Sequence, residues 1–235
     1  MEEESRSLVK RLERVVTSTP GEHVLNALKA GLATAPFCGG IASLMTDYIP
    51  SGKRKRLEQF AEQIARDLSD LKDRVDEARI LTDEFAFLFE KCFRGVAENY
   101  HREKLEAFRA ILLNTAVGAD LAEEEKEYFL NLVNTLSVLH IRILQFMHDP
   151  ASYLEAHKIP ADEIRGGFSE FFPVAIPGIG LEAIKSAFGD LHEYGLINTD
   201  KSIFGTMTSA QGLKLLGNRL SELGKQFVGF CTRPG

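Results

Sequence analysis

The chain has few cysteines and few prolines. Its three cysteines, Cys38, Cys92 and Cys231, are far apart and form no C-x-x-C pair, which argues against a disulfide framework or a zinc ribbon. Its eight prolines, with 44% hydrophobic and 26% charged residues, argue against long disorder or a fibrous repeat. We therefore expect a globular protein of a reducing compartment, the cytoplasm.

Positive charge and targeting signals are also scarce. A net charge of -6 and a pI near 5.6 mean that the average surface repels phosphate, so nucleic-acid binding is not expected without a local basic patch. The acidic start, Met1 to Glu4, lacks the basic and apolar regions of a secretory signal. We expect no export.

Enzyme motifs are absent as well. The sequence holds no Walker A loop, G-x-S-x-G, H-E-x-x-H or EF-hand loop, and Gly178-Ile179-Gly180 is only a fragment of a dinucleotide fingerprint. His140, His148 and His157 are too dispersed to suggest a metal site. The expectation is a non-enzymatic protein without metal or cofactor.

The most regular pattern in the chain is a heptad seam that starts at Leu57. Apolar residues follow at alternating spacings of 4 and 3. They are Leu57, Ala61, Ile64, Leu68, Leu71, Val75 and Ala78, with Phe85 and Phe89 in the same register. Thr82-Asp83 is a candidate N-cap, so the run can be two helices meeting at a bend. The seam needs a partner, which is either the rest of this chain or a second copy in a homodimer.

Further amphipathic patterns place about five helices between residues 57 and 148, which predicts an antiparallel helical bundle over 1–150. After Pro150 the composition changes. We expect short helices, an apolar loop at 171–177, a helix over 181–194, strands at 196–199 and 213–220 and a last helix capped by Ser221. With the helix over 136–147, this order resembles a winged-helix domain. The predicted fold is mainly α, with a small winged-helix-like α+β region at 151–235.

Residues 24–50 form the first candidate functional segment. The 17 residues between Lys29 and Asp47 carry no charge, and four cations follow shortly afterwards. An uncharged stretch of this length beside cations is typical of a segment that binds an anionic membrane. Pro36 and Gly39-Gly40 instead favour a helical hairpin buried within the protein. Both interpretations stay open. The candidate contact residues, for a membrane or for a partner protein, are Phe37, Ile41, Leu44, Lys53, Arg54, Lys55 and Arg56.

The sequence also carries features of two other functions. The pairs Arg94 and His101, and Arg142 and His148, have a spacing similar to that of HEPN ribonucleases, where the cation stabilises phosphate and the imidazole moves a proton. The winged-helix-like region could read DNA, but residues 161–235 hold seven Lys/Arg against eight Asp/Glu. Nucleic-acid binding is therefore the less favoured expectation.

The middle of the chain resembles a family of bacterial helical proteins. The residues that carry the resemblance are Glu103 to Phe108, Leu113-Asn114, Leu136, His140 to Leu144 and Asp149-Pro150. Over residues 50–150 the layout is similar to that of the abortive-infection alpha proteins of phage defence. The resemblance implies a non-enzymatic interaction or regulatory protein of the cytoplasm, at the periphery of the inner membrane if its hairpin is membrane-active, and it carries over no catalytic residue.

Overall fold

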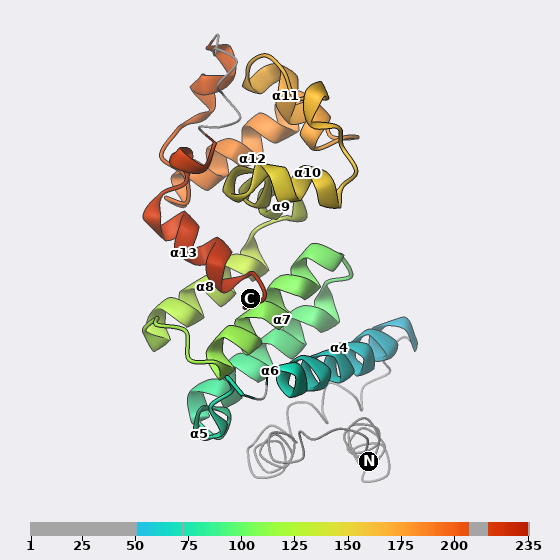
Figure 1. The fold of residues 1–235 in the computed structure, drawn as a ribbon, viewed down its shortest axis with the longest axis vertical. Helices are drawn as coiled ribbons and strands as arrows, with labels where there is room; N and C mark the ends of the chain where they lie inside the picture. Colours follow the sequence, from blue (N-terminus) through green and yellow to red (C-terminus); the bar gives the residue numbers. More distant parts are fainter. Residues whose placement is uncertain (1–50, 72, 207–215, 235) are drawn as a thin grey trace. The chain divides into compact units, whose positions relative to one another are not determined.

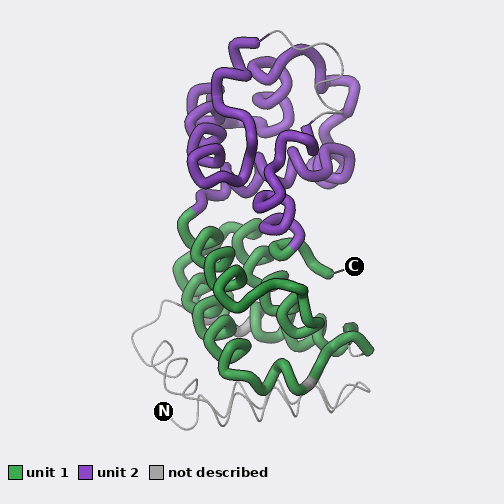
Figure 2. The backbone as a smooth tube through the Cα atoms, turned by 90° about the vertical axis from the view of Figure 1, so that its left-hand side faces the viewer, with its two compact units in different colours: residues 1–135, 230–235 green, residues 136–229 purple. Residues whose placement is uncertain are grey.

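The computed structural model describes residues 51–71, 73–206 and 216–234, which fold into helices joined by short connections (Figure 1). The expected mainly α class is confirmed. Two compact units divide the chain: unit 1 comprises residues 1–135 and 230–235, and unit 2 comprises residues 136–229 (Figure 2). Unit 2 begins at Leu136, whereas the sequence analysis divided the chain after residue 150. Unit 1 is thus discontinuous in sequence.

Unit 1 holds five helices in its described part. They are α4 (Ser51–Asp70), α5 (Glu77–Ile80), α6 (Asp83–Glu98), α7 (Arg102–Ala116) and α8 (Glu123–Thr135). Helix α6 is central because it packs against α4, α5, α7 and α8. Its apolar residues fill a buried face that includes Phe85, Leu88, Phe89, Cys92, Phe93 and Val96.

The heptad seam is confirmed over α4 but ends with it. Leu57, Ile64 and Leu68 are at most 2% exposed within the chain, so this part of the seam finds its partner intramolecularly. Helix α4 begins at Ser51 and stops at Asp70, leaving Val75 half-buried and Ala78 exposed. The predicted continuation is wrong because a turn and the short α5 intervene before Thr82.

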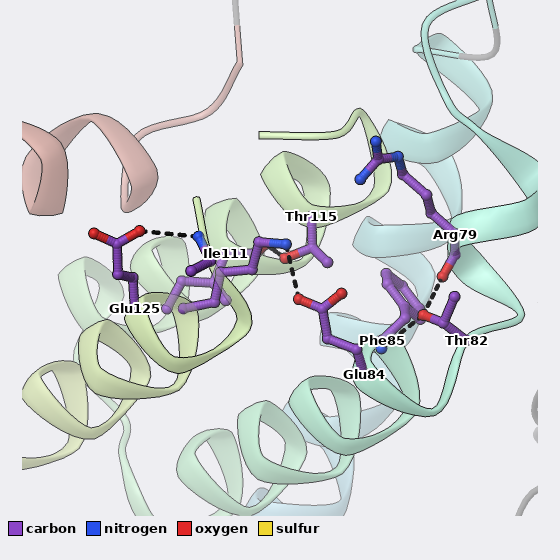
Figure 3. Close-up of polar contacts among 9 residues, drawn as sticks. Arg79, Thr82, Glu84, Phe85, Ile111, Thr115 and Glu125 are labelled. Atoms are coloured by element: carbon purple, nitrogen blue, oxygen red, sulfur yellow. Dashed lines mark hydrogen bonds and ion pairs between the residues drawn. The ribbon is translucent and has the colours of Figure 1, made fainter. Parts of the chain in front are cut away.

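Local capping signals fix the starts of two helices. The Thr82 hydroxyl accepts a hydrogen bond from the Phe85 amide at 3.2 Å, which confirms Thr82 as the N-cap of α6 (Figure 3). Helix α8 begins beside another such contact, in which the carboxylate of Glu125 accepts a hydrogen bond from the Ala122 amide at 2.9 Å.

Close packing between α6 and α7 depends on a glycine. A Cβ at Gly95 would lie 2.3 Å from the ring of Phe108, which is fully buried. The absence of a side chain at Gly95 therefore lets this ring lie directly against α6.

Unit 2 holds α9 (Val138–His148), α10 (Pro150–Ala156), α11 (Phe168–Ala175), α12 (Leu181–Glu193) and α13 (Glu222–Phe230). The last residue of α13, Phe230, belongs to unit 1. Short 3-10 turns lie at Ala161–Glu163, Lys201–Gly205 and Gly217–Arg219. The core of unit 2 is a cluster of aromatic rings: Phe146, Tyr153, Phe168, Phe171, Phe172, Phe188 and Phe204. This cluster explains why the predicted apolar loop at 171–177 is wrong. Phe168, Phe171 and Phe172 have the i, i+3, i+4 spacing that places all three rings on one helical face.

The predicted strands of a wing are wrong in extent. Ile197 and Leu220 form one isolated antiparallel bridge, and residues 217–219, part of the predicted return strand, form a 3-10 turn. The amide of Asn198 donates to Arg219 O at 2.9 Å and that of Ser221 to Leu196 O at 3.1 Å. Residues 213–215 of the predicted return strand lie outside the described residues. The described part of the chain therefore has a single bridge in place of a two-stranded wing.

The last helix begins as predicted. The Ser221 hydroxyl accepts from the Gly224 amide at 2.9 Å and donates to Gly195 O at 2.6 Å. A Cβ at Gly224 would lie 2.0 Å from Leu196 O, so α13 rests directly on the backbone of the bridge.

Candidate functional site

The first two turns of α4 carry the four predicted contact cations, Lys53 to Arg56. These residues belong to the helix itself, whereas the sequence analysis placed them before it. Helices usually begin with acidic residues because the helix dipole is positive at its N-terminus, and α4 has no acidic residue in its first turn. This turn is therefore a concentration of positive charge.

The structure separates the cations by role. Lys55 is exposed and Lys53 half-buried, and neither has an acidic partner among the described residues. Arg56 points elsewhere: its Nη2 donates to Ala97 O at 3.3 Å, near the C-terminal end of α6, where a cation complements the negative end of the helix dipole. Its Nε is buried without a hydrogen-bond partner in the described part of the chain. Arg56 is thus a structural residue, and the two lysines remain as available cations.

The apolar part of the predicted site cannot be placed. Phe37, Ile41 and Leu44, with the whole predicted hairpin 24–50, lie outside the described residues, and so does the side chain of Arg54. Among the helices that the structure describes, none alone has the length and apolar character needed to cross a membrane. Helices α8 and α9 reach that length and composition only when they are taken together, as a bent pair.

The first candidate ribonuclease pair is not brought together. Arg94 forms an ion pair with Glu90 on its own helix, and the ring of His101 stacks on Tyr100 with centroids 4.1 Å apart. The structure records no contact between Arg94 and His101, both of which lie in its described part. His148 is exposed as the last residue of α9, where a histidine complements the helix dipole.

A serine, a histidine and an aspartate meet in unit 2, an arrangement that the sequence analysis missed. His140 Nδ1 accepts from the Ser137 amide at 3.0 Å and lies 2.7 Å from Ser137 Oγ, and its Nε2 lies 3.2 Å from Asp190 Oδ2. The backbone donor at Nδ1 places the ring hydrogen on Nε2, which then donates to Asp190. The hydroxyl oxygen of Ser137 also accepts a hydrogen bond from the backbone amide of His140, so this hydroxyl caps the start of α9. These three residues cap the N-terminus of α9 and connect α9 to α12. The Ser-x-x-His spacing was the sequence signal from which the cap could have been predicted.

Unit 1 contains two further buried charge contacts. Lys126 Nζ on α8 lies 2.8 Å from Glu84 Oε1 on α6 (Figure 3). Lys104 is buried and donates to Asn134 O at 3.0 Å near the end of α8, and burial lowers its pKa from 10.5. A carbonyl near a helix C-terminus is a favourable place for this cation. Both lysines fix how helices of unit 1 pack.

The two described cysteines are held as thiols. Burial raises the pKa of Cys92 well above its ordinary value and also raises that of Cys231. Thiolate is the reactive form, so neither is suited to nucleophilic chemistry.

Ion binding by clustered side chains is likewise not indicated: the described residues contain no group of three or more His, Cys, Asp or Glu arranged to hold a metal. The best candidate site is therefore the first two turns of α4. No model of a known protein family, no curated protein and no solved structure matches the chain.

Proposed function

We propose that this is a non-enzymatic bacterial interaction or regulatory protein, of the phage-defence kind that the resemblance implies. It engages an anionic membrane surface or a partner protein through residues 24–50 and the cations that follow them. Its place of action is the cytoplasm and the periphery of the inner membrane.

The supporting observation is the pair of lysines at the start of α4. Lys53 and Lys55 come shortly after the uncharged segment, and no acidic side chain of the described residues neutralises them. Each lysine near an anionic membrane contributes about 1 kcal/mol to binding, so the two together supply about 2 kcal/mol. At 1.36 kcal/mol for each factor of ten, this corresponds to about 30-fold in affinity.

Flotation of the full chain with lipid vesicles tests this proposal. Vesicles of phosphatidylcholine mixed with phosphatidylglycerol are compared with vesicles of phosphatidylcholine alone. We expect binding to the anionic vesicles, weakened about 30-fold by the double substitution Lys53→Gln/Lys55→Gln and also weakened by salt.

The matched control is Lys201→Gln/Lys225→Gln, which removes two exposed lysines of unit 2 and changes the net charge equally. It should bind like the wild type. Equal losses in both double variants would show that overall charge, and not the start of α4, attracts the membrane. If the wild type does not float with either vesicle, the membrane form of the proposal is wrong and a protein partner is the remaining form.

For unit 2 we propose a reduced winged-helix-like arrangement that contacts protein. The supporting observations are the order of its helices and the antiparallel bridge between Ile197 and Leu220 after α12. The same observations favour a second candidate, a DNA-binding regulator. Against DNA, the one lysine of α12, Lys185, lies 2.8 Å from Glu182, and Asp190 and Glu193 are exposed on the same helix. A mobility shift with duplex DNA at low salt would overturn the protein-contact form.

A further inference from the structure

The chain returns to unit 1 at its described end. We call residues 230–233 the C-terminal strap. Phe230 is 3% exposed, and its ring lies 6.0 Å, between centroids, from that of Phe129 on α8. The amide group of Asn114 on α7 donates to Phe230 O at 2.9 Å and to Thr232 O at 2.8 Å. Arg233 then reaches α4, so the strap contacts three helices of unit 1.

The contact with α4 is a cluster of four charges. Arg233 Nη2 lies 3.2 Å from Asp67 Oδ1 and 3.5 Å from Asp70 Oδ2. Asp67 is also bound by Arg109 of α7, whose Nε donates to Oδ2 and whose Nη2 donates to Oδ1 at 2.5 Å. The side chain of Asp67 is 3% exposed, whereas that of Arg233 is 51% exposed. One buried carboxylate therefore has two arginine partners of different burial.

This difference makes the outer arginine easy to remove. When Arg233 leaves, Asp67 keeps Arg109, so no uncompensated buried charge remains. Arg233 itself is half exposed, and ion pairs of exposed side chains contribute little. Phe230, in contrast, is anchored by a buried ring. The strap thus combines a firm apolar anchor with a polar end that detaches at low cost.

The strap continues helix α13 of unit 2 without a linker. Gly229 is the last residue of unit 2, and Phe230 is both the end of α13 and the first residue of the strap. Because α13 and the strap are one continuous segment, a change in how α13 is held within unit 2 acts on the strap through Phe230. The start of α13 is held by Ser221, through its bonds to Gly195 and Gly224.

We propose that the strap is a releasable clasp through which unit 2 controls the stability of α4. With α13 in place, Asn114 and Arg233 hold the strap against α7 and α4. When unit 2 shifts α13, as on binding a partner, the polar end detaches and the last turns of α4 loosen. The proposal rests on the proposed function only in that α4 carries the contact lysines.

Hydrogen exchange of the full chain, followed by mass spectrometry without vesicles, tests the clasp. Ser221→Ala removes the cap of α13, and losing such a cap costs enough to raise local exchange about fivefold. We expect a rise of about twofold to fivefold in peptides covering Leu57 to Asp70 as well. The matched control, Asp149→Ala, removes the cap of α10 in the same unit and should leave α4 unchanged.

A variant that lacks the polar contacts of the strap tests whether the effect on α4 passes through them. In a variant carrying Asn114→Ala and Arg233→Gln, α4 should already exchange faster, and adding Ser221→Ala should change it no further. If Ser221→Ala loosens α13 while α4 exchanges as in the wild type, the strap is a static brace and the proposal is wrong. It is equally wrong if the effect on α4 persists in that background. Since exchange is measured without lipid, failure of the clasp and failure of membrane binding are separate results.

Discussion

Asp67 offers the sharpest test of what holds unit 1 together. The isosteric substitution Asp67→Asn keeps the volume of the side chain and removes the charge that two arginines share. Removing one partner of a buried ion pair costs about 3–5 kcal/mol because the other charge stays buried. The side chains of Arg109 and Arg233 are 24% and 51% exposed and regain part of their hydration, so we expect a loss of about 2–3 kcal/mol.

The control is Asp70→Asn, which removes the other carboxylate of the same cluster. The side chain of Asp70 is 69% exposed and lies 3.5 Å from Arg233, so its loss should cost less than about 0.5 kcal/mol. The contrast between the two aspartates measures the effect of burial, since both belong to the end of α4 and both contact the same arginine.

Urea denaturation can follow each unit separately because the chain contains no tryptophan. Tyr128→Trp reports on unit 1 and Tyr194→Trp on unit 2, and both tyrosines are partly exposed, at 42% and 38%. With an m-value of about 1–3 kcal/mol per molar urea, Asp67→Asn should lower the midpoint of unit 1 by about 0.7–3 M. If its midpoint matches that of Asp70→Asn, the buried pair does not hold α4 to α7 and the reasoning fails.

Three further predictions concern single side chains. Gly224→Ala should destabilise unit 2 by about 1–3 kcal/mol in the same urea assay, because the new methyl group meets the Leu196 carbonyl and improved helix propensity offsets only part of this; an unchanged midpoint would contradict the close approach. Asp149→Ala should cost about 1 kcal/mol near neutral pH through loss of the α10 cap. Hydrogen bonds from Ser152 lower the pKa of Asp149 below its ordinary 3.8, so this contribution is complete above pH 3.8 and is lost as the pH falls through the folded value; a difference from the wild type that persisted in strong acid would refute this. Burial lowers the pKa of Lys104 below 10.5, so the unfolded chain holds the extra proton between the two values, and the stability of the wild type relative to Lys104→Met should rise with pH across that interval.

The sequence predicted the helices whose signals are local. Helix α12 ends within one residue of its predicted bounds, and the caps at Thr82 and Ser221 form as expected. Each of these features depends on side chains within four positions of one another, so periodicity and capping preferences suffice to find them.

Features that depend on packing were missed. Pro173 lies inside α11, where the burial of three phenylalanine rings outweighs the cost of a proline in a helix. The wing was predicted from apolar residues flanking a Gly-rich stretch, but in the described part of the chain these residues form a single bridge, between Ile197 and Leu220, and both are buried. Neither feature can be predicted from a short stretch of sequence, because each depends on packing against residues elsewhere in the chain.

The candidate site was only partly predictable for the same reason. The cations before Leu57 stand out in the sequence, but the inward turn of Arg56 depends on the C-terminal end of α6, 41 positions away. Asp67 and Arg109 are 42 positions apart, and Arg233 comes from the far end of the chain. No spacing rule connects such residues.

The discontinuity of unit 1 has a consequence for how the protein is made. Translation delivers every described helix of unit 1 first and then all of unit 2, so the strap leaves the ribosome after everything it must hold together. Unit 2 can fold before the strap arrives, and α4 meanwhile lacks its contact with Arg233. A newly made chain therefore passes through an interval in which the end of α4 is present but lacks its contact with Arg233, and this interval ends only when residues 230–233 dock.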